Sequence, residues 1–166
     1  MKHITKIVLI LVSLLIMSGC CSTDANRMSG GDRALKKADY ERLKTLSGDW
    51  YLVSGERLGV EVEADPDQPF ISYSVSSGGH SVVETLFVGK PNEMTSVYYL
   101  ASGQLYMDHY CSLGNQPRMV ARSTPGDDIP FKLLSVSNMT DKNDLHISSH
   151  SVEFDGPDEL TVRWGA

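Results

Sequence analysis

Hydrophobic residues after the first third of the chain come in short runs that turn-forming residues separate. From Trp50 onward, runs rich in Val, Ile, Tyr, Thr and Phe alternate with clusters such as Ser77-Gly78-Gly79 and Gly114-Asn115. Turn signals that recur about every 8–12 residues are typical of antiparallel sandwiches and barrels. The predicted strands lie near residues 49–54, 57–63, 70–76, 80–88, 93–100, 104–111, 116–123, 131–137, 145–154 and 159–165.

A single helical pattern precedes the strands. Residues 33–46 carry apolar side chains at helical spacing, Asp32 can cap the start, and Ser47-Gly48 can end the helix. No second helical pattern could supply crossovers, so a parallel sheet is not expected. Simple hairpin connections favour a barrel, because closure removes exposed strand edges. We therefore expect an all-β fold, an antiparallel up-and-down barrel of about 8–10 strands with a short N-terminal helix.

The first 20 residues carry the pattern of a secretory leader. Lys2 and Lys6 precede an apolar run of eleven residues, Ile7 to Met17, and small residues follow it. Such a run is shorter than the roughly 20 residues that span the hydrocarbon core, which argues against an uncleaved transmembrane anchor. The string Met17-Ser18-Gly19-Cys20 resembles the lipobox of bacterial lipoproteins.

This resemblance implies that residues 1–19 are a signal peptide and that Cys20 becomes the diacylated N-terminus. Cys21 is the weaker alternative, because Cys20 would then occupy the cleavage site. Residues 20–32 are expected to form a lipidated tether, and residues 33–166 the barrel domain. The protein would then lie in the cell envelope, on the extracytoplasmic side of a membrane, and of the outer membrane in a Gram-negative host.

Two further segments carry a second resemblance. The sequence Gly48-Asp49-Trp50 follows the predicted helix and resembles the opening of lipocalins and other calycins. That resemblance implies that Trp50 plugs one end of the barrel and that an arginine near the last strand, here Arg163, packs across it by a cation–π contact. Residues 80–119 resemble a family of uncharacterised bacterial calycin-like proteins, through strings such as Glu84-Thr85-Leu86-Phe87 and His109-Tyr110-Cys111.

The calycin-like resemblance implies a fold and no established activity. It covers the chain from about Gly48 to Trp164 and is most specific in its middle third. Members of the family usually continue past the tryptophan that matches Trp164 through one more strand, whereas this sequence ends at Ala166. We therefore expect either closure with fewer strands or an edge open to a partner.

Charge narrows the classes of partner. Thirteen of the 15 basic residues and all 21 acidic residues follow the predicted leader, so its removal changes the formal charge from −6 to −8. An acidic chain without a basic patch argues against nucleic-acid binding. It also argues against electrostatic attraction to anionic lipid, so acyl chains would hold the protein on its membrane.

Strand alternation brings the candidate chemistry together. Leu105, Met107, His109 and Cys111 alternate along one predicted strand, and this apolar set is expected to face inward. If the matching face of residues 80–86 also points inward, Glu84 is a buried carboxylate that needs a partner. His109 and Arg118 are the available candidates for it. The candidate ligand-binding residues are Glu84, Tyr98, His109, Cys111, Gln116 and Arg118.

The remaining histidines do not indicate a metal site. His146 and His150 lie four positions apart, which on a strand separates them by more than about 13 Å, too far for one metal ion. They are expected to be exposed or individually hydrogen-bonded. No CxxC or HExxH motif is present, so neither a metal nor a cofactor is expected.

Three interpretations of the polar set remain open. The side chains could form a satisfied network that fixes strand register, line a binding site for a small ligand, or supply Cys–His chemistry. The favoured function is non-catalytic binding of a small apolar or amphipathic molecule inside the barrel. The alternatives are an interaction lipoprotein with a filled barrel and a pairing edge, and a His/Cys-based enzyme or metal protein. The sequence identifies no protein partner.

Overall fold

The computed structural model describes residues 29–57, 60–122 and 126–166. The predicted leader, Cys20 and the tether up to residue 28 lie outside the described residues. In chain order the elements are α1 (Gly30–Thr45), β1 (Gly48–Trp50), β2 (Glu56–Arg57), β3 (Val60–Glu61), β4 (Ile71–Ser76), the 3₁₀ turn η1 (Ser77–Gly79), β5 (Ser81–Leu86), β6 (Met94–Ala101), β7 (Gln104–Tyr110), β8 (Gln116–Ala121), β9 (Asp128–Ser137), β10 (Ser149–Phe154) and β11 (Leu160–Gly165).

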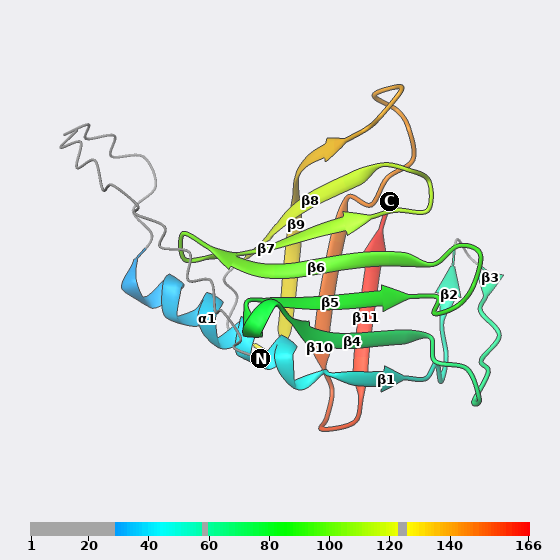
Figure 1. The fold of residues 1–166 in the computed structure, drawn as a ribbon, viewed down its shortest axis with the longest axis horizontal. Coiled ribbons are helices and arrows are strands. Elements are labelled where there is room, and N and C mark those ends of the chain that lie inside the picture. The colour runs from blue at the N-terminus through cyan, green and yellow to red at the C-terminus, as the bar shows by residue number, and fades with distance from the viewer. Residues whose placement is uncertain (1–28, 58–59, 123–125) are drawn as a thin grey trace, which may run out of the picture.

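One antiparallel sheet forms the body of the molecule. Its nine strands follow the order β1-β4-β5-β6-β7-β8-β9-β10-β11, while β2 and β3 form a separate hairpin. The sheet curls so that β9–β11 cross behind the layer made by β4–β7 (Figure 1). The mostly β fold and the simple antiparallel connections confirm the coarse prediction. The curl does not close, however: within the described residues β1 and β11 are edge strands, so the sheet is a half-barrel.

Several strands are shorter than the hydrophobic pattern predicts. The first ends at Trp50 instead of residue 54, and in place of the predicted strand 57–63 the structure has the two-residue arms β2 and β3, at 56–57 and 60–61. The predicted strand 145–154 begins at Ser149, because the preceding residues belong to a loop that bonds to the β7–β8 turn. Asn115 in that turn donates from Nδ2 to the carbonyl of Leu145 at 2.9 Å.

Helix α1 begins earlier than predicted. Its N-cap is Ser29, whose side chain accepts from the backbone N–H of Asp32, so Asp32 lies in the first turn and is not the cap. The helix therefore takes up the last residues of the predicted tether. An acidic side chain in the first turn is favourable beside the positive end of the helix dipole. Within the described ranges, no helix combines the length and apolar character needed to cross a membrane.

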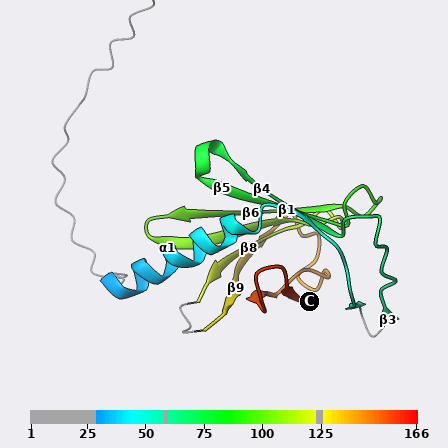
Figure 2. The ribbon, with the colours of Figure 1, turned by 90° about the horizontal axis from the view of Figure 1, so that it is seen from below.

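Helix α1 covers one open end of the half-barrel. Lys36 donates from Nζ to the carbonyl of Ala121 at the end of β8, at 2.6 Å. Tyr40 donates from its hydroxyl to the carbonyl of Gly79 in the β4–β5 turn, at 3.1 Å. Figure 2 shows α1 in the opening between the β4–β7 layer and β9. Burial lowers the pKa of the Lys36 ammonium, whose one hydrogen-bond partner is a neutral carbonyl.

A cation fastens the C-terminal half of α1 to the back layer. Arg42 donates to the carbonyl of Asp127 just before β9, at 2.9 Å. Its guanidinium also lies 4.2 Å from the ring centroid of Phe154 on β10. The helix thus bonds to both layers.

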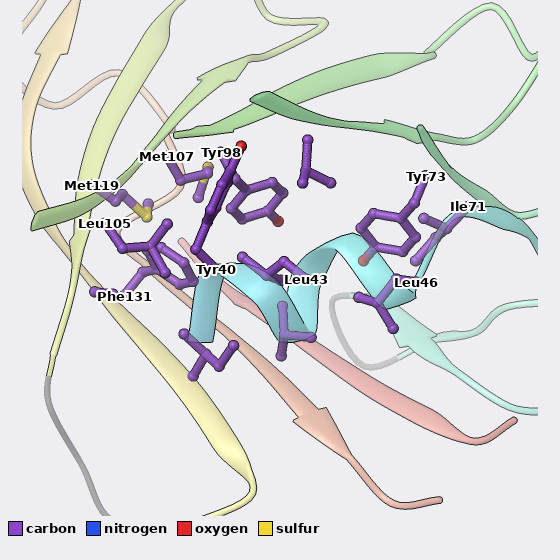
Figure 3. Close-up of a cluster of buried hydrophobic side chains, with 14 of the residues drawn as sticks. Tyr40, Leu43, Leu46, Ile71, Tyr73, Tyr98, Leu105, Met107, Met119 and Phe131 are labelled. Atoms are coloured by element: carbon purple, nitrogen blue, oxygen red, sulfur yellow. The ribbon is translucent and has the colours of Figure 1, made fainter. Parts of the chain in front are cut away.

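The hydrophobic core fills the concave side of the sheet. Tyr40 and Leu43 of α1 and its C-cap residue Leu46 point toward side chains of the front and back layers (Figure 3). Leu43, Tyr98 and the alternating Leu105 and Met107 of β7 have no solvent-exposed surface. The helix and the inner face of the sheet therefore share one hydrophobic core.

Candidate functional site

A row of polar side chains crosses the inner face of the front layer. Tyr73 on β4 is the cross-strand neighbour of Glu84 on β5, Glu84 of Ser96 on β6, and Ser96 of His109 on β7. Glu84, Ser96 and His109 are 0% exposed and Tyr73 is 2% exposed. The prediction that Glu84 and His109 face inward is confirmed.

Two tyrosines hold the Glu84 carboxyl group. The Tyr73 hydroxyl lies 2.9 Å from Oε1 and the Tyr98 hydroxyl 2.7 Å from Oε2. Burial raises the pKa of Glu84, while the hydrogen bonds from both tyrosines partly oppose that shift. Burial beside this carboxyl group also holds the pKa of both phenols well above its usual range. The tyrosines are therefore neutral hydrogen-bonding groups.

Tyr98 connects the front layer to the back layer. Its hydroxyl lies 2.9 Å from Nε2 of His150 on β10, and Nδ1 of His150 lies 3.2 Å from the carbonyl oxygen of Arg163 on β11. The His150 ring stacks on Trp164 with a centroid distance of 3.9 Å. Burial lowers the pKa of His150 to about 3, so the imidazole is neutral near pH 7.

The hydrogen-bond partners assign the protons of this chain. Nδ1 of His150 faces a carbonyl, which can only accept, so this nitrogen carries a proton. The single phenolic hydrogen of Tyr98 cannot be donated to both Glu84 and His150. Tyr98 donates to Oε2 of Glu84, and its hydroxyl oxygen faces Nε2 of His150.

His109 belongs to the same row but has only one hydrogen bond. Its Nδ1 lies 3.0 Å from the hydroxyl oxygen of Ser96, and its Nε2 is buried without a partner. The ring centroid lies 5.0 Å from that of Trp164. Burial lowers the pKa of His109 to about 4. This neutral imidazole in an apolar contact therefore has no proton acceptor or donor at its second nitrogen.

Cys111 lies at the rim of the half-barrel. Strand β7 ends at Tyr110, and the half-buried thiol of Cys111 contacts the Met94 sulfur at 3.9 Å and accepts from the N–H of Leu113 at 3.5 Å. Cys111 thus follows the end of β7 and is only half-buried, whereas His109 is fully buried. Neither the Met94 sulfur nor the Leu113 N–H can act as a base for the thiol.

Arg118 and Gln116 lie away from the polar row. Arg118 is exposed and forms a bidentate ion pair with Asp108, with Nε 2.7 Å from Oδ1 and one terminal guanidinium nitrogen 3.0 Å from Oδ2. The Asp108 carboxylate raises the pKa of Arg118. Gln116 donates to the carbonyl of Gly114 in the adjoining turn. The prediction of Arg118 as a partner for Glu84 is wrong, because Arg118 faces outward just before a register shift at Met119.

The predicted stacking of Arg163 on Trp50 is also wrong. Trp50 donates from its indole nitrogen to the carbonyl of Leu46, at 2.7 Å, and so closes the turn after α1. Arg163 is exposed and pairs with Glu153 on the outer face of the β10–β11 hairpin. The alternation along β11 explains this, since it turns Val162 and Trp164 inward and leaves Arg163 outside.

Four members of the network escaped the sequence analysis. Tyr73 and Ser96 lie opposite Glu84, but their register could not be fixed without the turns between the strands. His150 alternates with Val152, and this signal could have placed it inward. Trp164 stacks on His150 from the neighbouring strand. The contacts of His150 with Tyr98 and of Trp164 with His109 join strands that meet only because the sheet curls.

The row of polar side chains is buried, which limits what could bind to it. Among the described residues, no group of three His, Cys, Asp or Glu side chains could hold a metal ion. Two solvent-open hollows have volumes of about 420 and 450 Å³. The first lies between the start of α1 and the β6–β7 turn. The second is lined by residues of β9–β11 and their flanks, among them Arg122, Arg163 and the network residue His150. The polar row is a buried, hydrogen-bonded network.

The free edge of β11 is the second candidate site. Asp155 donates from its backbone N–H to the carbonyl of Glu159. This hydrogen-bonded pair identifies the β11 residues whose backbone groups bond to β10. By antiparallel alternation, Thr161, Arg163 and Gly165 bond to β10. The backbone groups of Leu160, Val162 and Trp164 then face away from β10, and β11 pairs with no other described strand.

Comparison with known proteins assigns no family. No family model matches the chain, no curated protein matches it, and no solved structure matches it.

Proposed function

We propose that this chain is a lipid-anchored protein of the cell envelope with a calycin-like half-barrel that binds a partner protein through the edge of β11. The observation that carries the proposal is the unpaired edge beside a filled interior. Leu160, Val162 and Trp164 present backbone donors and acceptors that no described strand uses. An unpaired strand edge is a template for an added strand, and main-chain hydrogen bonds supply the affinity.

The filled interior favours this function over binding of a small ligand in the barrel. A small-molecule site needs a hollow of roughly 300 Å³ or more that buries most of its ligand. On the concave side, α1 and the core side chains occupy the corresponding space, and Glu84, Tyr98 and His109 have no exposed surface.

Hydrogen exchange on the native membrane tests the proposal. In envelope membranes we expect the amides of Leu160, Val162 and Trp164 to exchange slowly, because a partner strand accepts from them. After dilution in detergent they should exchange fast. The amides of Thr161 and Arg163, which bond to β10, are the internal control and should be protected in both states. Fast exchange at the three edge amides in membranes would refute the proposal.

The lipid anchor has its own test. Replacing Cys20 by Ser should abolish incorporation of labelled fatty acid and should accumulate the uncleaved precursor. The matched variant Cys21→Ser should be lipidated normally. Labelling that survives in C20S and disappears in C21S would move the attachment site by one residue. Labelling in neither wild type nor variants would remove the anchor from the proposed function.

A further inference from the structure

We propose that the strand bound at the β11 edge is β11 of a second copy of this chain, antiparallel and centred on Val162. This inference rests on the proposed function and names its partner. A two-fold axis through Val162 would join the two half-barrels through one continuous sheet, a self-complementary contact of the kind that cyclic dimers use.

The first argument is the match of backbone groups. In the register centred on Val162, Val162 lies opposite its own copy, and Leu160 lies opposite Trp164 of the second chain. These are the residues whose N–H and C=O groups face away from β10. Opposed residues of an antiparallel pair that face each other in this way exchange two hydrogen bonds. All the free groups of Leu160, Val162 and Trp164 are thus satisfied at once.

The second argument is the match of side chains on the inner face. Leu160, Val162 and Trp164 pack against the core but remain only partly buried. In this register, each Trp164 indole meets Leu160 of the second copy, and the two Val162 side chains meet each other. Aromatic–aliphatic cross-strand pairs of this kind stabilise sheets. The pairing would cover the surface that the edge leaves exposed.

The third argument is charge on the outer face. Arg163 would lie opposite Thr161 of the second copy, so no like charges oppose each other. Thr161 is also the cross-strand neighbour of Glu153, which places that carboxylate on the side where the incoming guanidinium lies. A register centred on Arg163 would set two guanidinium groups against each other, and like charges directly opposite are destabilising. Charge therefore selects against this neighbouring register.

The shared anchor supports self-association over binding of a different protein. All lipidated copies are held on one membrane surface, so their effective concentration is raised without any added contact. Each copy also carries both the edge and the strand that matches it.

Disulfide trapping in membranes tests this register. Thr161→Cys and Arg163→Cys are each introduced into the full lipidated chain with Cys21→Ser and Cys111→Ser, so that no other free thiol is present. Residue 161 of one copy and residue 163 of the other would form a non-hydrogen-bonded cross-strand pair. The Cα atoms of such a pair lie about 4.5 Å apart, within the range for a disulfide. The two variants carry different tags and are expressed separately or together. Labelling with a water-soluble maleimide checks that each thiol is exposed in the folded chain.

We expect a disulfide-linked dimer only when T161C and R163C are expressed together, and it should carry both tags. A dimer of R163C alone or of T161C alone would overturn the register centred on Val162. If no expression scheme gives a dimer while the edge amides are still protected in membranes, a different protein occupies the edge; self-pairing is refuted and the proposed function stands. If the edge amides are also unprotected, both proposals fail.

Discussion

Replacing His109 by Leu should change how stability depends on pH. His109 is fully buried and its Nε2 has no partner, so the folded chain resists protonation there. Its pKa lies near 4 in the folded protein and near 6.5 in the unfolded chain. A base with a depressed pKa contributes stability above its unfolded pKa and loses it as the pH falls toward the folded value.

The size of the effect follows from this difference. Between pH 7.5 and pH 5, the unfolded wild type takes up a proton at His109 that the folded protein excludes. The free energy of unfolding therefore falls by about 2 kcal/mol from this residue, and by about 3 kcal/mol at pH 4. The variant has no such group. At pH 7.5, loss of one hydrogen bond to Ser96 and removal of an unsatisfied nitrogen oppose each other, so both proteins should have similar stability.

Urea unfolding at a series of pH values measures this effect. The stability of His109→Leu relative to wild type should rise by about 2 kcal/mol from pH 7.5 to pH 5. His80→Leu, at an exposed position before β5, is the matched control and should show no comparable rise. A stability difference between His109→Leu and wild type that stays constant across this range would refute the buried, neutral imidazole.

Three further changes test other parts of the structure. Glu84→Gln should alter stability by less than about 1 kcal/mol at pH 4, because an amide of the same shape can still hydrogen-bond to both Tyr73 and Tyr98. Since the pKa of Glu84 is raised, wild type should lose stability relative to this variant as the pH rises above 4.5, which urea unfolding from pH 4 to 8 would measure. If the variant is instead clearly less stable than wild type at every pH, Glu84 is ionised in the folded protein. Ser29→Ala removes the N-cap of α1 and should cost about 1 kcal/mol in urea unfolding, whereas no change would exclude the cap. Leu43→Ala opens the contact between α1 and the sheet and should cost about 2–5 kcal/mol, measured by thermal unfolding, and a smaller loss would indicate that the helix packs loosely.

Alternation along single strands explains what the sequence could predict. Glu84 and His109 face inward because each belongs to a strand whose apolar residues recur at every second position. The helix was also predictable, since its apolar spacing and ending are local. Its start was misplaced because Ser29 and Asp32 can both cap a helix, and the choice depends on which backbone N–H the side chain reaches.

Contacts between layers explain what the sequence could not predict. Tyr98 and His150 are hydrogen-bonded although 52 positions separate them, and the contact exists only because β10 crosses behind β6. The sequence offers Arg118 as a candidate partner for Glu84, but in the structure its own cross-strand neighbour Asp108 pairs with it on the outside. A local pattern gives the face of a side chain, whereas the curl of the sheet decides which faces meet.

The buried network and the free edge are physically connected. His150 contacts the Arg163 carbonyl on β11 and, through Tyr98, the carboxyl group of Glu84 on β5. If the inner face of β5 shifted by one residue, Glu84 would leave the core and this chain of hydrogen bonds would break. The network therefore favours one register and one position of the β10–β11 hairpin relative to the front layer. An edge that is held in one position loses little conformational freedom when a second strand binds to it, which is the property that a strand-pairing surface requires.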